Sequence, residues 1–76
     1  MIFSHKIQDI KFDEKFLILD VDGKQFKIAL EKASVKLKSA TDIERNLYKI
    51  SPSGYGIHWP LLDEDLAVDA LIKVAE

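Results

Sequence analysis

The residues with the clearest capacity for chemistry lie near the end of the chain, where His58 is followed by Asp63, Glu64 and Asp65. Carboxylate oxygens suit Mg²⁺ or Ca²⁺, and a single imidazole suits a transition metal. Three consecutive acids cannot all point at one ion unless the backbone curls tightly, and the spacing of a calcium loop is absent. Asp63 and Asp65 are two residues apart and can share a side. We nevertheless expect no metal site here.

The residues needed for other kinds of catalytic site are absent from the sequence or wrongly spaced. The chain has no cysteine, which excludes a thiol nucleophile, a thiolate zinc site and a disulfide scaffold. His5 is the only histidine besides His58, and no serine stands in an elbow context, so a catalytic triad is not indicated. Thr41 and Glu44 have the spacing of a helix capping box. The Gly54-Tyr55-Gly56 stretch precedes an expected strand and indicates a turn, not a phosphate loop. We expect no enzyme, no catalytic residue and no cofactor.

Three aromatic residues lie in the same part of the chain as His58: Tyr48, Tyr55 and Trp59. Stacking on nucleic-acid bases requires exposed aromatics interleaved with cations, and Lys49 is the only cation among these. The net charge of −2 also disfavours a non-specific nucleic-acid binder. The aromatics therefore either close a small core or anchor a protein interface, where tyrosine and tryptophan are enriched.

The length and composition of the chain are those of a small single-domain protein. Its 76 residues predict a single domain over 1–76. The longest apolar runs are far shorter than the ~18 residues that span a bilayer. The segment Met1–Lys6 becomes polar by its fourth residue and lacks a signal-peptide core. We expect a cytoplasmic protein with no membrane association.

The charge is uneven along the chain. Residues 1–49 carry ten Lys/Arg and eight Asp/Glu, whereas residues 50–76 carry one lysine and five acids. Such asymmetry can attract a basic partner, because complementary fields favour encounter. It can also reflect helix chemistry, since carboxylates are favoured at helix N-termini. The sequence leaves both interpretations open.

The first half predicts three strands, over residues 7–12, 16–21 and 25–30. Asp22-Gly23 between two apolar runs is a strong signal for a type I′ hairpin turn. This turn fixes the register and places one set of side chains on a common face. The predicted pairs are Val21 with Lys24, Leu19 with Phe26 and Leu17 with Ile28.

The second half alternates helix and strand signals. Apolar spacing predicts a short amphipathic helix over residues 30–40, and the capping box predicts a helical turn over 42–46. Residues 47–51 and 56–59 form an expected second hairpin, and a closing helix follows Asp63–Asp65. The predicted fold class is α+β: a small antiparallel sheet from two hairpins plus an N-terminal strand, with short helices, including a C-terminal helix, packed on one side.

The segment IHWP-x-LDEDL, residues 57–66, resembles the bacterial domain-of-unknown-function family 2442. That family is itself described as similar to the N-terminal domain of a Nitrosomonas structural-genomics protein. The resemblance covers the whole chain and is strongest from residue 40 onward. Ala67 stands where many members carry a serine that would cap the last helix.

The resemblance implies no enzymatic activity and no catalytic residue. Members are often encoded beside another short protein, and the pair resembles a type II toxin–antitoxin module in which this domain is the antitoxin. Other members are fused to a helix-turn-helix domain, which implies a regulatory role.

Two functional hypotheses follow. The first is a non-enzymatic interaction module, antitoxin-like, whose partner is the small protein encoded by the adjacent gene. The second is a ligand-sensing or DNA-regulatory accessory domain with a concave site near His58 and Trp59. Under the first hypothesis, aromatic anchors and acidic side chains form the partner-binding surface: Tyr55, His58, Trp59, Asp63, Glu64 and Asp65.

Overall fold

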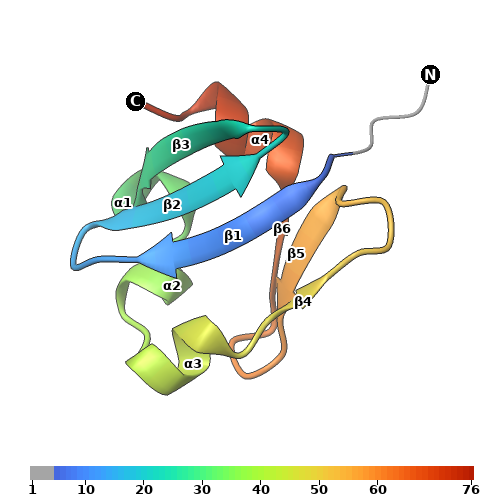
Figure 1. Ribbon diagram of the computed structural model, residues 1–76. Helices are drawn as coiled ribbons and strands as arrows, with labels where there is room; N and C mark the ends of the chain where they lie inside the picture. The colour runs from blue at the N-terminus through green and yellow to red at the C-terminus, as the bar shows by residue number, and fades with distance from the viewer. Residues whose placement is uncertain (1–4) are drawn as a thin grey trace.

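The computed structural model describes residues 5–76, in which six strands form two antiparallel sheets (Figure 1). The first sheet has the order β1-β2-β3, with β1 at Ile7–Phe12, β2 at Phe16–Val21 and β3 at Lys24–Ala29. The second has the order β4-β5-β6, with β4 at Lys49–Ile50, β5 at Gly56–Trp59 and β6 at Glu64–Ala67. The helices are α1 (Leu30–Ala33), α2 (Val35–Lys38), α3 (Asp42–Asn46) and α4 (Val68–Lys73).

The α+β fold class is therefore confirmed, with the strands divided between two sheets instead of joined in one. The expected absence of a signal-peptide core concerns a segment whose residues 1–4 lie outside the described residues. Within residues 5–76 no helix is long and apolar enough to cross a membrane.

The first hairpin has the predicted register. Leu19 pairs with Phe26 and Leu17 with Ile28. Asp22 and Gly23 both have positive φ, 53° and 81°, as a type I′ turn requires. The strand before it is irregular, because the pairing of β1 with β2 shifts register between Ile7 and Asp9. This bulge at Gln8 lets the Gln8 side chain accept the Gly23 N–H at 3.0 Å.

The predicted helix over residues 30–40 is interrupted at Ser34. Its φ of −169° and ψ of 122° are extended, so α1 ends before it and α2 begins after it. The Ser34 hydroxyl accepts the N–H of Leu37 at 3.2 Å as the N-cap of α2. The same hydroxyl donates to Oε2 of Glu64 in β6 at 2.6 Å. A tertiary contact thus fixes the break, which helical periodicity alone does not reveal.

The C-terminal third also departs from expectation. Glu64 and Asp65 lie in strand β6, which pairs with β5 along its length, and the closing helix begins only at Val68. The interpretation of the acids at 63–65 as helix N-terminal charges is therefore wrong. Asp69 is the acidic residue in the first turn of α4.

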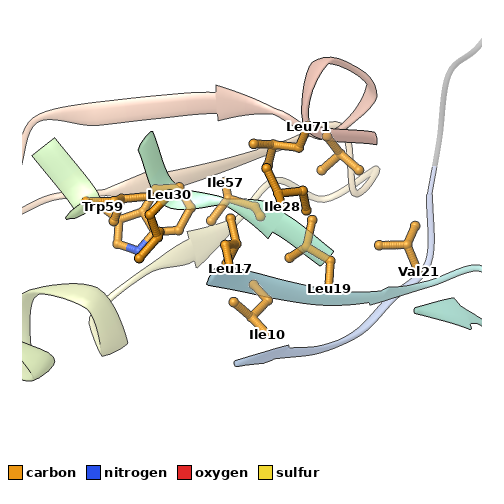
Figure 2. Close-up of a cluster of buried hydrophobic side chains, with 11 residues drawn as sticks. Ile10, Leu17, Leu19, Val21, Ile28, Leu30, Ile57, Trp59 and Leu71 are labelled. Atoms are coloured by element: carbon orange, nitrogen blue, oxygen red, sulfur yellow. The ribbon is translucent and has the colours of Figure 1, made fainter. Parts of the chain in front are cut away.

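One core joins the two sheets. Side chains from both sheets and from the helices point toward one another between them (Figure 2). Trp59 is fully buried in it, with its ring centroid 6.5 Å from that of Phe12 and 6.3 Å from that of Tyr48. The largest fully buried side chains are Leu17, Leu19, Val21, Ile28, Leu30, Leu37, Ile57, Trp59 and Val68.

Arg45 in α3 supports this core from its edge. It is only 8% exposed, and its guanidinium donates to the carbonyl oxygens of Leu37 and Lys38, each at 2.9 Å. These carbonyls end α2, where a cation is favoured by the helix dipole. The Arg45 carbonyl in turn accepts the indole N–H of Trp59 at 2.9 Å. The predicted capping box is confirmed at the start of α3, between Thr41 and Glu44.

Candidate functional site

A row of three polar side chains crosses the outward face of the second sheet. Lys49 is paired with His58, and His58 is paired with Asp65. Directly opposite residues of antiparallel strands share a face, so the three side chains project together. Ile57 and Trp59, which alternate with His58 along β5, are 1% and 0% exposed and face the core. The row therefore faces away from the core, as the sequence predicts for His58.

Within this row His58 and Asp65 form a close pair. The Nδ1 atom of His58 lies 2.7 Å from Oδ1 of Asp65. Because an ionised carboxylate only accepts, Nδ1 carries the proton and donates to it. This bond orients the ring and leaves Nε2 available to another group. Both side chains are open to water, at 40% and 75% exposure.

A hollow of about 490 Å³ lies beside this row. The neighbouring pair on the same face is Gly56 with Ala67. Because neither residue has a large side chain, the surface of the sheet is recessed at this pair. A Cβ atom at Gly56 would stand only 3.3 Å from the carbonyl oxygen of Leu66, so even alanine is tight there. The hollow is lined in part by Lys49, Ile50, Tyr55, Gly56, His58 and Ala67.

The two aromatic anchors expected from the sequence have different positions. Tyr55 is 55% exposed and lines the hollow, so it is available to a partner. Trp59 is fully buried with its indole N–H bonded to the Arg45 carbonyl, and its place on the partner-binding surface is corrected. It faces the core because it alternates with His58 along β5. Ile50, which pairs with Ile57, is 41% exposed and lines the hollow, and the sequence did not single it out.

The three acids do not form one patch. Asp63 lies in the turn before β6 with a φ of 49°, and its carbonyl oxygen accepts from the Lys36 ammonium at 3.2 Å. Glu64 points to the other side of the strand and accepts the Ser34 hydroxyl. Only Asp65 belongs to the outward row. The acids thus diverge because successive residues of a strand face opposite sides.

This divergence also bears on metal binding. Within residues 5–76 no group of three or more histidine, cysteine, aspartate or glutamate side chains is arranged to hold a metal ion. The His58–Asp65 pair provides one imidazole and one carboxylate at an open surface. Such a pair can accept a hydrogen bond from a bound group or donate one to it.

Comparison with known proteins places the chain in a family. A family model described as "Protein of unknown function (DUF2442)" matches residues 7–76. The chain belongs to the DUF2442 family. This confirms the family expected from the sequence.

A solved structure similar to this DUF2442 chain is the crystal structure of a protein of unknown function from Rhodospirillum rubrum. The two are 27% identical with a TM-score of 0.72, and the match covers 93% of this chain and 88% of the other. No curated protein matches the sequence.

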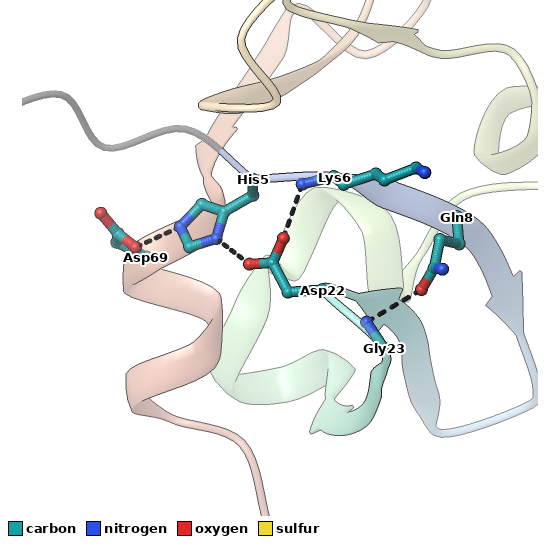
Figure 3. A network of polar contacts seen from close by, with 6 residues as sticks. All are labelled: His5, Lys6, Gln8, Asp22, Gly23 and Asp69. Atoms are coloured by element: carbon teal, nitrogen blue, oxygen red, sulfur yellow. Dashed lines mark hydrogen bonds and ion pairs between the residues drawn. The ribbon is translucent and has the colours of Figure 1, made fainter.

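A second polar cluster in this DUF2442 chain was not predicted from the sequence. His5 lies between the carboxylates of Asp22 and Asp69 (Figure 3). The Asp22-Gly23 turn was identifiable, but nothing local in the sequence relates His5 to a residue 64 positions later. Only the closure of the fold, which brings α4 beside the start of β1, reveals this cluster.

Proposed function

We propose that this chain is a non-enzymatic protein-interaction module that binds its partner on the outward face of the second sheet. The observation that carries the proposal is the hollow of about 490 Å³ beside the Lys49–His58–Asp65 row. It combines exposed apolar surface, from Ile50 and Tyr55, with oriented polar groups at its edge. Protein interfaces commonly have such an apolar centre and polar rim.

The exposure of the polar groups supports a binding role over a catalytic one. Electrostatic catalysis depends on a site that excludes water, where dipoles and charges act strongly. His58 and Asp65 are 40% and 75% exposed, so water screens both groups. A partner that covered the face would desolvate the pair and give its hydrogen bonds full weight.

We infer that the partner is the small protein encoded by the adjacent gene, with this chain as the antitoxin-like component. The family resemblance supports this choice, and Asp65 places one of the acids of residues 50–76 on this face. Within the outward row, Lys49 and Asp65 place opposite charges on the two outer strands. A partner with the complementary order of charges would dock in one orientation.

Co-expression with the adjacent gene product tests this function. We expect the wild-type chain to co-purify with the adjacent gene product. The variants Ile50→Asp and Tyr55→Ala should not retain this partner. Matched controls are Ile43→Asp in α3 and Val35→Ala in α2, exposed apolar residues outside the hollow at 76% and 73% exposure. If the partner is retained by the hollow variants, or the pair never co-purifies and the neighbour alone is harmless to cells, the proposal is wrong.

The hollow also favours a second candidate, a ligand-sensing or DNA-regulatory accessory domain. Its volume of about 490 Å³ is in the range of small-molecule sites. Tyr55 would then stack on the ligand and the free Nε2 of His58 would bond to it. A thermal-shift screen of metabolites and divalent cations against the wild type and Tyr55→Ala distinguishes the candidates. A shift that Tyr55→Ala abolishes supports ligand sensing, and no shift with any compound removes it.

A further inference from the structure

The His5 ring connects three segments that are distant in the sequence (Figure 3). Its Nδ1 atom lies 2.8 Å from Oδ2 of Asp22 in the β2–β3 turn. Its Nε2 atom lies 2.6 Å from Oδ1 of Asp69 in α4. The Asp22 carboxylate also accepts the backbone N–H of Lys6 at 2.8 Å. The start of β1, the hairpin turn and the last helix are thus held by one imidazole.

The chemistry of these contacts favours the charged form of His5. Ionised carboxylates only accept hydrogen bonds, so each ring nitrogen must donate, and a ring with two N–H groups is an imidazolium. In accord with this, the hydrogen bonds to Asp22 and then to Asp69 raise the pKa of His5, although burial acts against them. The hydrogen bond from the Lys6 N–H, and to a smaller extent the one from the His5 ring, lowers the pKa of Asp22. Asp22 from the turn and Asp69 from α4 are the charged groups that face the ring.

The backbone of His5 also contacts the loop that borders the hollow. The His5 N–H donates to the carbonyl oxygen of Ser53 at 2.9 Å. Gly54 lies so close that a Cβ atom there would stand 1.8 Å from the His5 carbonyl oxygen. The next residue, Tyr55, lines the hollow, and its carbonyl accepts the N–H of Val68 at the start of α4. Both the ring and the backbone of His5 therefore restrain elements that shape the hollow.

We propose that His5 is a proton-controlled latch for the partner-binding face: charged His5 holds the 51–55 loop and α4 in place, and loss of its proton loosens the Tyr55 side of the hollow. This inference rests on the proposed function, because it concerns regulation of the same face. A neutral imidazole donates from only one nitrogen, so one of the two carboxylates loses its bond on deprotonation. The partner therefore binds most tightly on the acidic side of the His5 titration.

The alternative is that His5 only stabilises the fold, with a loop that does not respond to its proton. Nuclear magnetic resonance separates the two. We expect the amide shifts of Ser53, Gly54 and Tyr55 to titrate with the same midpoint as the His5 ring, and to lose that transition in His5→Gln. Loop amides that do not follow the His5 ring would overturn the latch.

Binding to the adjacent gene product supplies the second measurement. We expect the dissociation constant to rise about fivefold from pH 6 to pH 8.5 for the wild type, within the usual range of coupling between sites. His5→Gln should show a clearly smaller rise over this range than the wild type, because only the part of the dependence that comes from His5 is removed. If the partner binds equally at both pH values, the latch is overturned while the proposed function stands. If the loop amides follow the His5 titration but the partner binds at neither pH, the proposed function is wrong, and the proposed regulation of this face is then wrong as well.

Discussion

The Nε2 atom of His5 lies 2.6 Å from Oδ1 of Asp69, although 64 positions separate the two residues. This contact joins the beginning of the first sheet to the helix that follows the second. Together with the bond from His5 Nδ1 to Asp22, it makes the stability of the fold dependent on pH.

The first prediction is the shape of that dependence. His5 has a raised pKa when folded, so its contribution is complete below the unfolded value of 6.5 and is lost as pH rises through the folded value. Asp22 has a lowered pKa, so its contribution is complete above 3.8 and is lost as pH falls through the folded value. Urea unfolding at a series of pH values should therefore show greatest stability between these limits. An alkaline decrease of equal size in His5→Gln would contradict the assignment.

The second prediction concerns the core. Leu19 is fully buried and pairs with Phe26 in the first hairpin. Leu19→Ala should lower the free energy of unfolding by about 2–5 kcal/mol, because it removes buried surface and leaves a cavity. Urea denaturation measures this, with the exposed Val35→Ala as the control. A near-neutral Leu19→Ala would show that this face of the hairpin is not buried.

The third prediction concerns the break between α1 and α2. Ser34→Ala removes the N-cap of α2 and the hydroxyl that donates to Glu64. Loss of a serine N-cap costs about 0.5–2 kcal/mol. Thermal or urea unfolding should show this loss, and the double variant with Glu64→Gln should lose less than the sum of the two single variants. Full additivity would indicate that the Ser34–Glu64 bond does not contribute.

The fourth prediction concerns Arg45. Arg45→Met keeps much of the side-chain volume but removes the guanidinium bonds to the carbonyls of Leu37 and Lys38, of which the Leu37 carbonyl keeps the Ala40 N–H. Buried polar groups that lose a partner cost about 1–3 kcal/mol. The variant should unfold at lower urea concentration, while the Trp59 indole keeps its acceptor, because that acceptor is the backbone carbonyl of residue 45. Unchanged stability would show that water replaces the guanidinium without cost.

These examples show what sequence patterns capture. The Asp22-Gly23 turn and the alternation of Leu17, Leu19 and Val21 are local signals, and both the turn and the register follow from them. The capping box of Thr41 with Glu44 is equally local. Each depends on residues within a few positions of one another.

The errors come from contacts between distant segments. Ser34 interrupts an apparently continuous helix because Glu64, 30 positions later, binds its hydroxyl. The acids before α4 resemble a helix start, yet pairing with β5 draws Glu64 and Asp65 into a strand. Of the residues expected on the partner-binding surface, Tyr55, His58 and Asp65 are exposed, whereas Trp59 lies in the core. Its size and hydrogen-bond donor fit either role, and only the packing of the two sheets decides between them.

The central claim is that the outward face of the second sheet binds the partner, and chemical-shift mapping tests it most directly. Isotopically labelled chain would be titrated with the unlabelled product of the adjacent gene. We predict that the largest amide changes fall on Lys49, Ile50, Tyr55, His58 and Asp65, around the hollow. Changes confined to α2 and α3, or saturating titration that leaves these five amides unmoved, would contradict the claim.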